Sequence, residues 1–200
     1  MINNLELIKP LLNFENEGDF YMLYIFKRKK DQPEGERDNH QSVRTIRSYC
    51  IKSIEQLEKR YDEVIMMCEM FKARAYIHVQ KQNHRDVSLN MMVALAQRIQ
   101  DGNHEQQNLF DSVVGQLKTL EKRWIIDVDI KDVGFAEEVA EFINSLRPEG
   151  PKIETAIPTK NGYHLITKRF DVMEFKKQYP DIDIQKKNPT LLFLPNSLED

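Results

Sequence analysis

The sequence predicts an α+β fold, and three observations support that prediction. Amphipathic helical stretches are interspersed with short strands, and the last third of the chain follows the order strand, helix, hairpin, helix, hairpin. An Asn-Gly dipeptide at 161–162 lies between two apolar segments, which indicates a tight hairpin. The 200 residues are 40% hydrophobic and 30% charged with only 7 Gly and 8 Pro, which excludes collagen-like, low-complexity and wholly disordered chains.

The first 121 residues are expected to form an N-terminal α/β lobe that belongs to the same compact unit as the rest. Its strands are recognised by apolar, aromatic or alternating composition and its helices by apolar residues at helical spacing, with Ser53 as an N-cap. The expected strands are 19–27, 43–52 and 73–80. The expected helices are 4–12, 53–71, 85–100 and 104–120.

Residues 122–200 are expected to form the second lobe. A strand over 123–130 is followed by an amphipathic helix, and the hairpin around the Asn-Gly turn is expected to pair beside that strand. The remaining expected elements are the helix 135–146, the hairpin strands 152–158 and 162–168, the helix 171–179 and a final strand pair of 181–185 with 190–194.

Charge and motif content exclude several classes of protein. The net charge of −3 argues against a protein that coats nucleic acid by bulk charge, although basic residues gather in 27–47, 72–85 and 160–187 and could form a basic face or simply solvated edges. No apolar run reaches the roughly 20 residues of a membrane span and the N-terminus lacks a secretory pattern, so a cytoplasmic protein with no membrane partner is expected. Two cysteines make neither a disulfide framework nor a four-cysteine zinc site, and Walker and serine-hydrolase motifs are absent from the sequence.

Asp127 and Asp129 are the sharpest chemical feature. Alternate residues of a strand share one face and lie about 6.6 Å apart along the chain, so both carboxylates are expected on one side. The opposite face then carries Trp124, Ile126 and Val128. Two acids on one side of an apolar strand are costly unless a cation or solvent relieves them, and Mg²⁺ or Mn²⁺ bound with substrate phosphates is a natural partner. Taken alone, the pair favours the simpler interpretation of an acidic strand end in water.

His164 strengthens the functional interpretation. It lies two residues after Gly162 on the second arm of the expected hairpin, where a small residue lets backbone N–H groups approach a phosphate. The histidine and Lys160 add donors, while a strand histidine beside a simple turn is the alternative. A third acid follows in Asp181 or Asp183. Two acids, a helix, a Gly-x-His hairpin and a third acid make an ordered set that is less expected by chance than any of its parts.

That ordered set resembles the archaeo-eukaryotic primase superfamily, which includes the polymerase domains of bacterial end-joining ligases. The first motif of this family, an apolar strand with acid-x-acid, is matched by 125–129, and the second, a small residue-x-His after a glycine-containing turn, by 159–164. The third, an aspartate on a strand followed by a basic or Asn stretch and a second strand, is matched best by Asp183 with Asn188, Thr190 and Pro195, because the residues after Asp183 fit better than those after Asp181. The resemblance covers 122–195, and Gly162 stands where the family usually has serine.

The resemblance implies a primase-like core, in which an RRM-like mixed or antiparallel sheet has helices on one side and adjoins the N-terminal α/β lobe. The second lobe, 122–200, would carry the metal and nucleotide sites. The implied activity is that of a DNA or RNA primase-type nucleotidyltransferase of DNA replication, which joins nucleoside triphosphates on a DNA or RNA template by two-metal phosphoryl transfer. Mg²⁺ or Mn²⁺ would be held by Asp127, Asp129 and Asp183, and the nucleotide by Thr159, Lys160, Asn161, Gly162 and His164. A helicase or another replication protein is an implied partner.

Two alternatives stay open at this point. A primase-like protein without activity could use its basic segments to hold nucleic acid or a replication partner. A metal-dependent nuclease could use the same Asp127 and Asp129 pair, but 154–156 departs from the acid-x-Lys pattern expected on the neighbouring strand.

Overall fold

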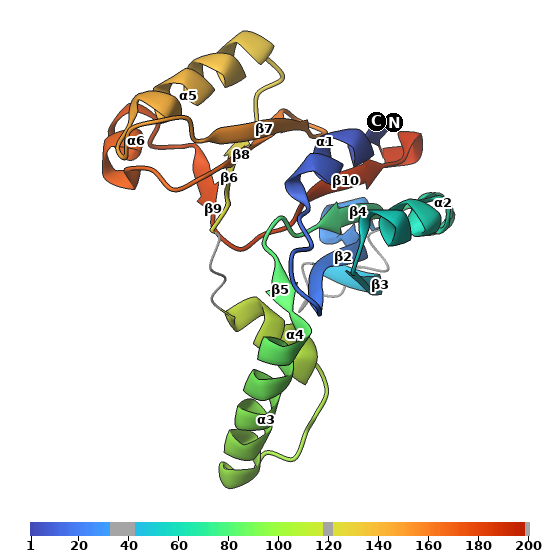
Figure 1. Ribbon diagram of the computed structural model, residues 1–200. Helices are drawn as coiled ribbons and strands as arrows, with labels where there is room; N and C mark the ends of the chain where they lie inside the picture. The colour runs from blue at the N-terminus through green and yellow to red at the C-terminus, as the bar shows by residue number, and fades with distance from the viewer. Residues whose placement is uncertain (33–42, 118–121, 199–200) are drawn as a thin grey trace.

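Two antiparallel sheets organise the protein, as seen in a computed structural model that describes residues 1–32, 43–117 and 122–198 (Figure 1). The first sheet has the order β1-β10-β4-β2-β3, with β5 paired to β2, and the second has the order β7-β8-β6-β9. The expected α+β class is confirmed. The strands of the first sheet are β1 (Ile2–Asn3), β2 (Asp19–Arg28), β3 (Val43–Ile51), β4 (Arg74–Ile77), β5 (Gln82–Asn83) and β10 (Thr190–Leu194).

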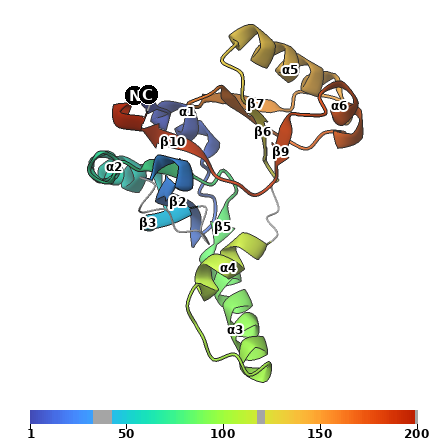
Figure 2. The ribbon, with the colours of Figure 1, turned by 180° about the vertical axis from the view of Figure 1, so that it is seen from behind.

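The second sheet contains the expected hairpin. Its strands are β6 (Trp124–Val128), β7 (Ile153–Pro158), β8 (Tyr163–Thr167) and β9 (Asp183–Gln185). β7 and β8 pair antiparallel across the Asn-Gly turn, and β8 also pairs with β6, as the sequence predicts. The helices α5 (Val133–Ser145) and α6 (Val172–Gln178) lie on one side of this sheet (Figures 1 and 2). Ile126 and Val128 pack into the core beneath these helices, so the face of β6 opposite to Asp127 is apolar, as expected.

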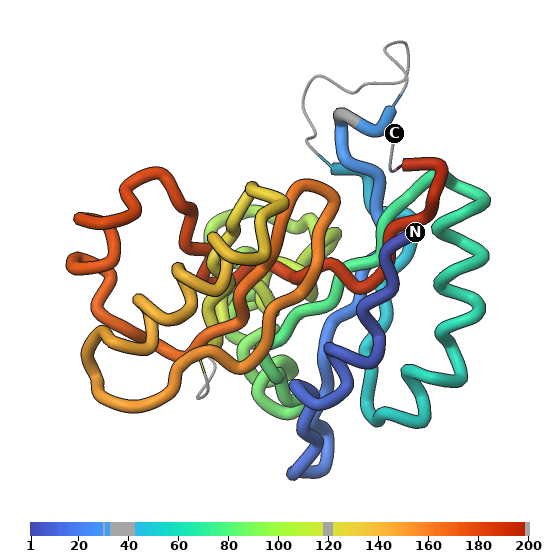
Figure 3. The backbone as a smooth tube through the Cα atoms, turned by 90° about the horizontal axis from the view of Figure 1, so that it is seen from above, coloured from blue at the N-terminus to red at the C-terminus, as the bar shows by residue number. Residues whose placement is uncertain are grey.

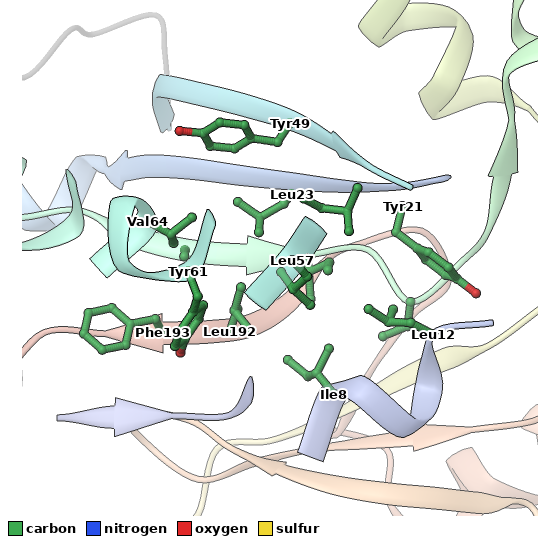
Figure 4. Packing of buried hydrophobic residues seen from close by; sticks show 14 of the residues in the cluster. Ile8, Leu12, Tyr21, Leu23, Tyr49, Leu57, Tyr61, Val64, Leu192 and Phe193 are labelled. Atoms are coloured by element: carbon green, nitrogen blue, oxygen red, sulfur yellow. The ribbon is translucent and has the colours of Figure 1, made fainter. Parts of the chain in front are cut away.

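The main core lies against the first sheet, between its strands and the helices α1 (Leu5–Ile8) and α2 (Ile54–Phe71). The Ser53 hydroxyl accepts a hydrogen bond from the Gln56 backbone N–H at 3.1 Å, which confirms the expected N-cap of α2. One stripe of α2 is buried because its apolar residues recur every three or four positions. Figure 4 shows part of this core, including Leu57, Tyr61 and Val64 from α2 with Leu23 and Phe193 from the sheet.

A helical hairpin extends from the body below the first sheet (Figures 1 and 2). It consists of α3 (His84–Gln100) and α4 (Leu109–Gln116), which pack against each other and, at the base, against Phe20 and Met22 of β2. The second helix is shorter than the expected 104–120. It begins at 109 because the chain reverses after Gly102, where a positive φ of 75° suits glycine. The predicted end at 118–120 lies outside the described residues.

The expected pairing of 181–185 with 190–194 is wrong. β9 pairs with β6 of the second sheet, whereas β10 crosses to the first sheet and pairs with β1 and β4. Figure 3 shows this red segment reaching the blue N-terminal one. All five residues of β10 are buried, with Leu192 and Phe193 in one core and Leu191 and Leu194 in another. A strand that is apolar on both faces must lie inside a sheet, because an isolated hairpin cannot cover both faces.

Arg123 joins the two sheets. Its guanidinium contacts Glu154 of β7 at 2.7 Å and donates to the carbonyl oxygens of Leu11 at 2.9 Å and Val79 at 3.2 Å. We expect Arg123→Ala to lower the free energy of unfolding by about 2–4 kcal/mol, because it leaves a half-buried carboxylate and two carbonyls without their donor. Urea unfolding measures this loss. Lys177→Ala, which breaks the exposed pair with Glu174, is the control and is expected to change stability by less than about 1 kcal/mol. If the two substitutions lowered the free energy of unfolding equally, the role of Arg123 in joining the two sheets would be refuted.

His78 gives the fold a pH dependence. Its ring packs edge-on to Tyr24 with 5.7 Å between centroids, and burial lowers its pKa to about 4. The unfolded chain binds a proton near pH 6.5, whereas the folded chain does not, so stability falls as the pH drops from 6.5 towards 4. We expect a loss of about 1 kcal/mol by pH 5.5. Urea titrations at pH 7.5 and 5.5 should show this difference in the wild type and a smaller one in His78→Gln. If His78→Gln lost as much stability between pH 7.5 and 5.5 as the wild type does, His78 would not be the cause of the pH dependence.

Candidate active site

Three predicted site residues lie in one row across the second sheet. In the antiparallel register, Asp127 of β6 is directly opposite His164 of β8 on one side and Asp183 of β9 on the other. Directly opposed residues point to the same face, with Cβ atoms about 4.5–5.5 Å apart. The sheet therefore brings together side chains that are up to 56 positions apart in the sequence, between Asp127 and Asp183.

The row lies on the face of the second sheet that turns towards the first sheet. Ile125 and Ile166 share this face with Asp127 and are fully buried in the main core, while Ile157 of β7 extends the row beside His164. The residues of this face next to Asp127 and His164 are thus apolar. Asp127 is half-buried and Asp183 is exposed, so the row marks the place where this face meets solvent.

His164 is held from both sheets. Its Nε2 lies 3.5 Å from Oδ1 of Asp127, and its Nδ1 is 2.9 Å from Oγ1 of Thr190 on β10. Thr190 is fully buried and its hydroxyl can donate or accept, so it fixes the ring for either tautomer. Only 8% of His164 is exposed, so packing restricts the orientation of its ring.

The surroundings of Asp127 favour its ionised form. The hydrogen bond from His164 is the main cause that lowers its pKa, and the charges of His164 and Arg28 and a hydrogen bond from Gln185 act in the same direction, while burial opposes them. The Gln185 Nε2 donates to Oδ2 of Asp127 at 2.9 Å. Each carboxylate oxygen of Asp127 thus already has a polar neighbour on the protein. A carboxylate whose pKa is lowered, at the edge of an apolar face, suits a cation.

The two remaining acids are placed less closely. β6 ends at Val128, so Asp129 comes directly after the strand, where it is exposed. The expected strand over 123–130 is therefore shorter than predicted. Asp181 is also exposed and precedes β9, whereas Asp183 is the first residue of that strand and is paired with Asp127. Of the two candidates for the third acid, the sheet register brings only Asp183 opposite to Asp127.

Asp127 and Asp183 offer the kind of ligands that Mg²⁺ or Mn²⁺ uses. Mg²⁺ in proteins is commonly bound by one or two carboxylates together with substrate phosphates and water, and not by a complete protein cage. Among the described residues, no group of three or more His, Cys, Asp or Glu side chains is arranged to hold an ion by itself. The donor set of the row thus fits a metal that arrives with a phosphorylated ligand.

The turn between β7 and β8 carries the other predicted nucleotide-binding residues. The Gly162 N–H donates to Oγ1 of Thr159 at 3.1 Å, and the Thr159 N–H donates to the Gly162 carbonyl at 2.8 Å, so the turn is closed at both ends. Lys160 donates to the Leu198 carbonyl at 2.7 Å, and Asn161 is exposed. The Lys160 side chain is thus held against the segment that contains Leu198.

Gly162 packs directly on the end of β6. A Cβ at this position would lie 1.9 Å from the Val128 carbonyl oxygen and 2.6 Å from the Ile130 nitrogen. Both atoms belong to the backbone, so no side chain can rotate away. The close approach requires glycine at this position, and it fixes the turn against the segment that contains Asp129.

Three residues that contact or act on the row are not among the site residues that the sequence predicts. Gln185 holds Asp127, Thr190 holds His164, and the charge of Arg28 at the end of β2 acts on Asp127. Gln185 could have been found, because it lies two residues after Asp183 and so shares its face of the strand. Thr190 and Arg28 belong to the first sheet. Their proximity depends on how the two sheets pack, which no local pattern encodes.

A cavity of about 1240 Å³ lies elsewhere, between the α3–α4 hairpin and the start of β2 and β5. Asp127, His164 and Asp183 do not line it. Its Lys81 is paired with Glu15 and Asp19 at 3.4 and 3.3 Å. The candidate site is therefore at the solvent-exposed edge of the second sheet and does not belong to this cavity.

Comparisons with family models, with curated proteins and with solved structures found no significant match to the chain. Within the described ranges, no helix combines the length and the apolar character needed to cross a membrane.

Proposed function

We propose that the protein is a primase-like nucleotidyltransferase that joins nucleoside triphosphates on a nucleic-acid template. The observation that carries this proposal is the row of His164, Asp127 and Asp183 on three paired strands. These are one residue from each of the three motifs that resemble the archaeo-eukaryotic primase superfamily. A chance resemblance in sequence gives no reason for the three motifs to meet in one row.

Each residue of the row has a role in the proposed reaction. Asp127 and Asp183, with Asp129 at the end of β6, would hold Mg²⁺ or Mn²⁺, which supplies neutralisation of the charge that develops on the transferred phosphoryl group. His164 is oriented by Thr190 and would donate to a phosphate oxygen, and Lys160 and the turn backbone would bind the rest of the triphosphate. Catalysis of this kind depends mainly on positioning and charge stabilisation.

The proposed partners follow from this activity. The substrates are nucleoside triphosphates and the template is DNA or RNA. Arg28, which lies near enough to Asp127 to lower its pKa, brings positive charge from the first sheet to the site. We propose that the protein acts in the cytoplasm together with a helicase or another replication protein.

Template-directed extension tests the proposed function. Purified protein is incubated with a primed and an unprimed template, labelled nucleoside triphosphates and Mn²⁺ or Mg²⁺, and the products are separated on a denaturing gel. We expect products longer than the primer that require the metal and disappear with EDTA. Shortened template in place of extended product would support the nuclease alternative. If the protein binds nucleotide but neither extends the primer nor shortens the template, the proposed catalytic activity is contradicted.

One observation favours the second candidate, a primase-like binding protein without catalysis. Both carboxylate oxygens of Asp127 already face His164 and Gln185. If these contacts persist with nucleotide and metal present, the site would be a structural network that keeps the motif. Binding of single-stranded nucleic acid without metal-dependent nucleotide binding would identify this case. For the nuclease alternative, Glu154 does not lie on a strand next to β6, because β7 pairs with β8, and its carboxylate is already paired with Arg123.

A further inference from the structure

The α3–α4 hairpin carries an apolar surface with no partner in the described part of the chain. Four large apolar side chains of α3 are strongly exposed: Leu89 by 52%, Met92 by 69%, Val93 by 70% and Ile99 by 53%. The hairpin extends away from both sheets (Figures 1 and 2). Contiguous exposed apolar side chains of this kind mark interaction surfaces in soluble proteins.

Three of these residues, together with the exposed Ala96, form one stripe along the helix, whereas Val93 lies to one side of it and lines the cavity beside α4. At 100° per residue, Leu89, Met92, Ala96 and Ile99 fall within a narrow sector, and their spacing of three, four and three residues is that of a helix-pairing seam. The opposite side of α3 already packs on α4 through Val87, Met91, Ala94 and Leu95. α3 is therefore apolar on two sides, one of which the hairpin covers and the other of which it leaves exposed.

The stripe complements itself when two copies run antiparallel. In that arrangement Met92 of one copy meets Ala96 of its partner, so that a large side chain faces a small one, and Leu89 meets Ile99. A parallel pair would place Met92 against Met92 and Ala96 against Ala96, which leaves both a clash and a gap. Large-to-small matching in both directions from one sequence is the property of an isologous, two-fold interface.

Charge also favours the antiparallel pair. Arg85, which is exposed, continues the stripe one turn before Leu89. In the antiparallel arrangement it reaches the C-terminal end of the partner's α3, where the helix dipole is negative and Asp101 caps the helix. The two helix dipoles then also oppose each other.

We propose that the exposed stripe of α3 pairs antiparallel with α3 of a second copy of this chain and makes a homodimer. The interface spans about two heptads and is small, so we expect a reversible dimer with a dissociation constant on the order of tens of micromolar. The row of Asp127, His164 and Asp183 lies in the second sheet and not in this hairpin, so the inference stands apart from the proposed function.

Sedimentation velocity over a series from low to high micromolar protein tests the dimer. The wild type is expected to shift from monomer towards dimer, and Ala96→Glu, which places a charge at the centre of the stripe, is expected to remain monomeric at every concentration. Asn90→Glu adds the same charge on the flank of α3 and should dimerise like the wild type. Circular dichroism confirms that the variants stay folded. A wild type that is monomeric throughout, or a dimer that Ala96→Glu does not weaken, overturns the proposal.

Disulfide trapping tests the direction. Under mild oxidation, a mixture of Met92→Cys and Ala96→Cys proteins should give a linked heterodimer, whereas Leu89→Cys alone should give no more linked species than the wild type with its native Cys50 and Cys68. Efficient linking of Leu89→Cys to itself would show a parallel pair and contradict the antiparallel arrangement.

Discussion

The Gly162→Ala substitution is expected to lower the free energy of unfolding by about 3 kcal/mol or more, because the new methyl group would meet backbone atoms. The Val128 carbonyl oxygen would lie 1.9 Å from the new Cβ and the Ile130 nitrogen 2.6 Å from it. Relief requires the turn to move away from the end of β6, and this movement also shifts His164 relative to Asp127. Urea unfolding at neutral pH measures the stability, and metal-dependent nucleotide binding measures the site.

Gly115→Ala is the matched control for this prediction. Gly115 lies in α4, where a Cβ would meet nothing within 4 Å. Alanine favours the helix more than glycine does, so this variant is expected to be more stable than the wild type by about 0.5–1 kcal/mol. If Gly162→Ala were as stable as the wild type, the close contact between the turn and β6 would be refuted.

The Asp127→Asn substitution is expected to lower metal-dependent nucleotide incorporation by about 10²–10³-fold or more, which is the usual cost of removing one group that stabilises charge in a transition state. Asparagine keeps the shape and can still accept from Gln185, so the fold should survive. The negative charge that would hold the cation is lost. Initial rates of extension with saturating Mn²⁺ measure the effect, and the midpoint of urea unfolding checks that the fold is intact.

Asp183→Asn and Asp181→Asn decide which acid completes the row. Asp183 is paired with Asp127, whereas Asp181 precedes β9, and both are exposed. We expect Asp183→Asn to reduce incorporation nearly as much as Asp127→Asn, and Asp181→Asn to leave it within about threefold of the wild type, as a surface change that touches no bound group should. The reverse order would place the third acid at position 181.

Local patterns were sufficient for much of the second sheet. The Asn-Gly dipeptide predicted the β7–β8 hairpin, and the alternation around Asp127 predicted which face of β6 is apolar, because turn chemistry and the two-residue period act over a few positions. The same reasoning failed for β10. Its five buried residues mark a strand that is covered on both faces, but they do not say which sheet covers it.

The candidate site divides in the same way. The order of acids and histidine could be read from the sequence, and so could the expectation that the hairpin lies beside the acid-bearing strand. The contact of Thr190 with His164 could not, since it depends on β10 crossing between the sheets. The steric requirement for glycine at position 162 could not be predicted either. The atoms that a side chain would meet there are those of Val128 and Ile130, more than 30 positions earlier in the chain.

Binding of a labelled nucleoside triphosphate in the presence of Mn²⁺ tests the central claim most directly. The wild type is compared with Asp127→Asn and with His164→Ala, with and without the metal. We predict that the wild type binds nucleotide only with Mn²⁺, and that each variant loses most of that binding while remaining folded. A wild type that binds no nucleotide with Mn²⁺, or variants that bind as well as it does, would contradict the claim that His164, Asp127 and Asp183 form a nucleotide and metal site.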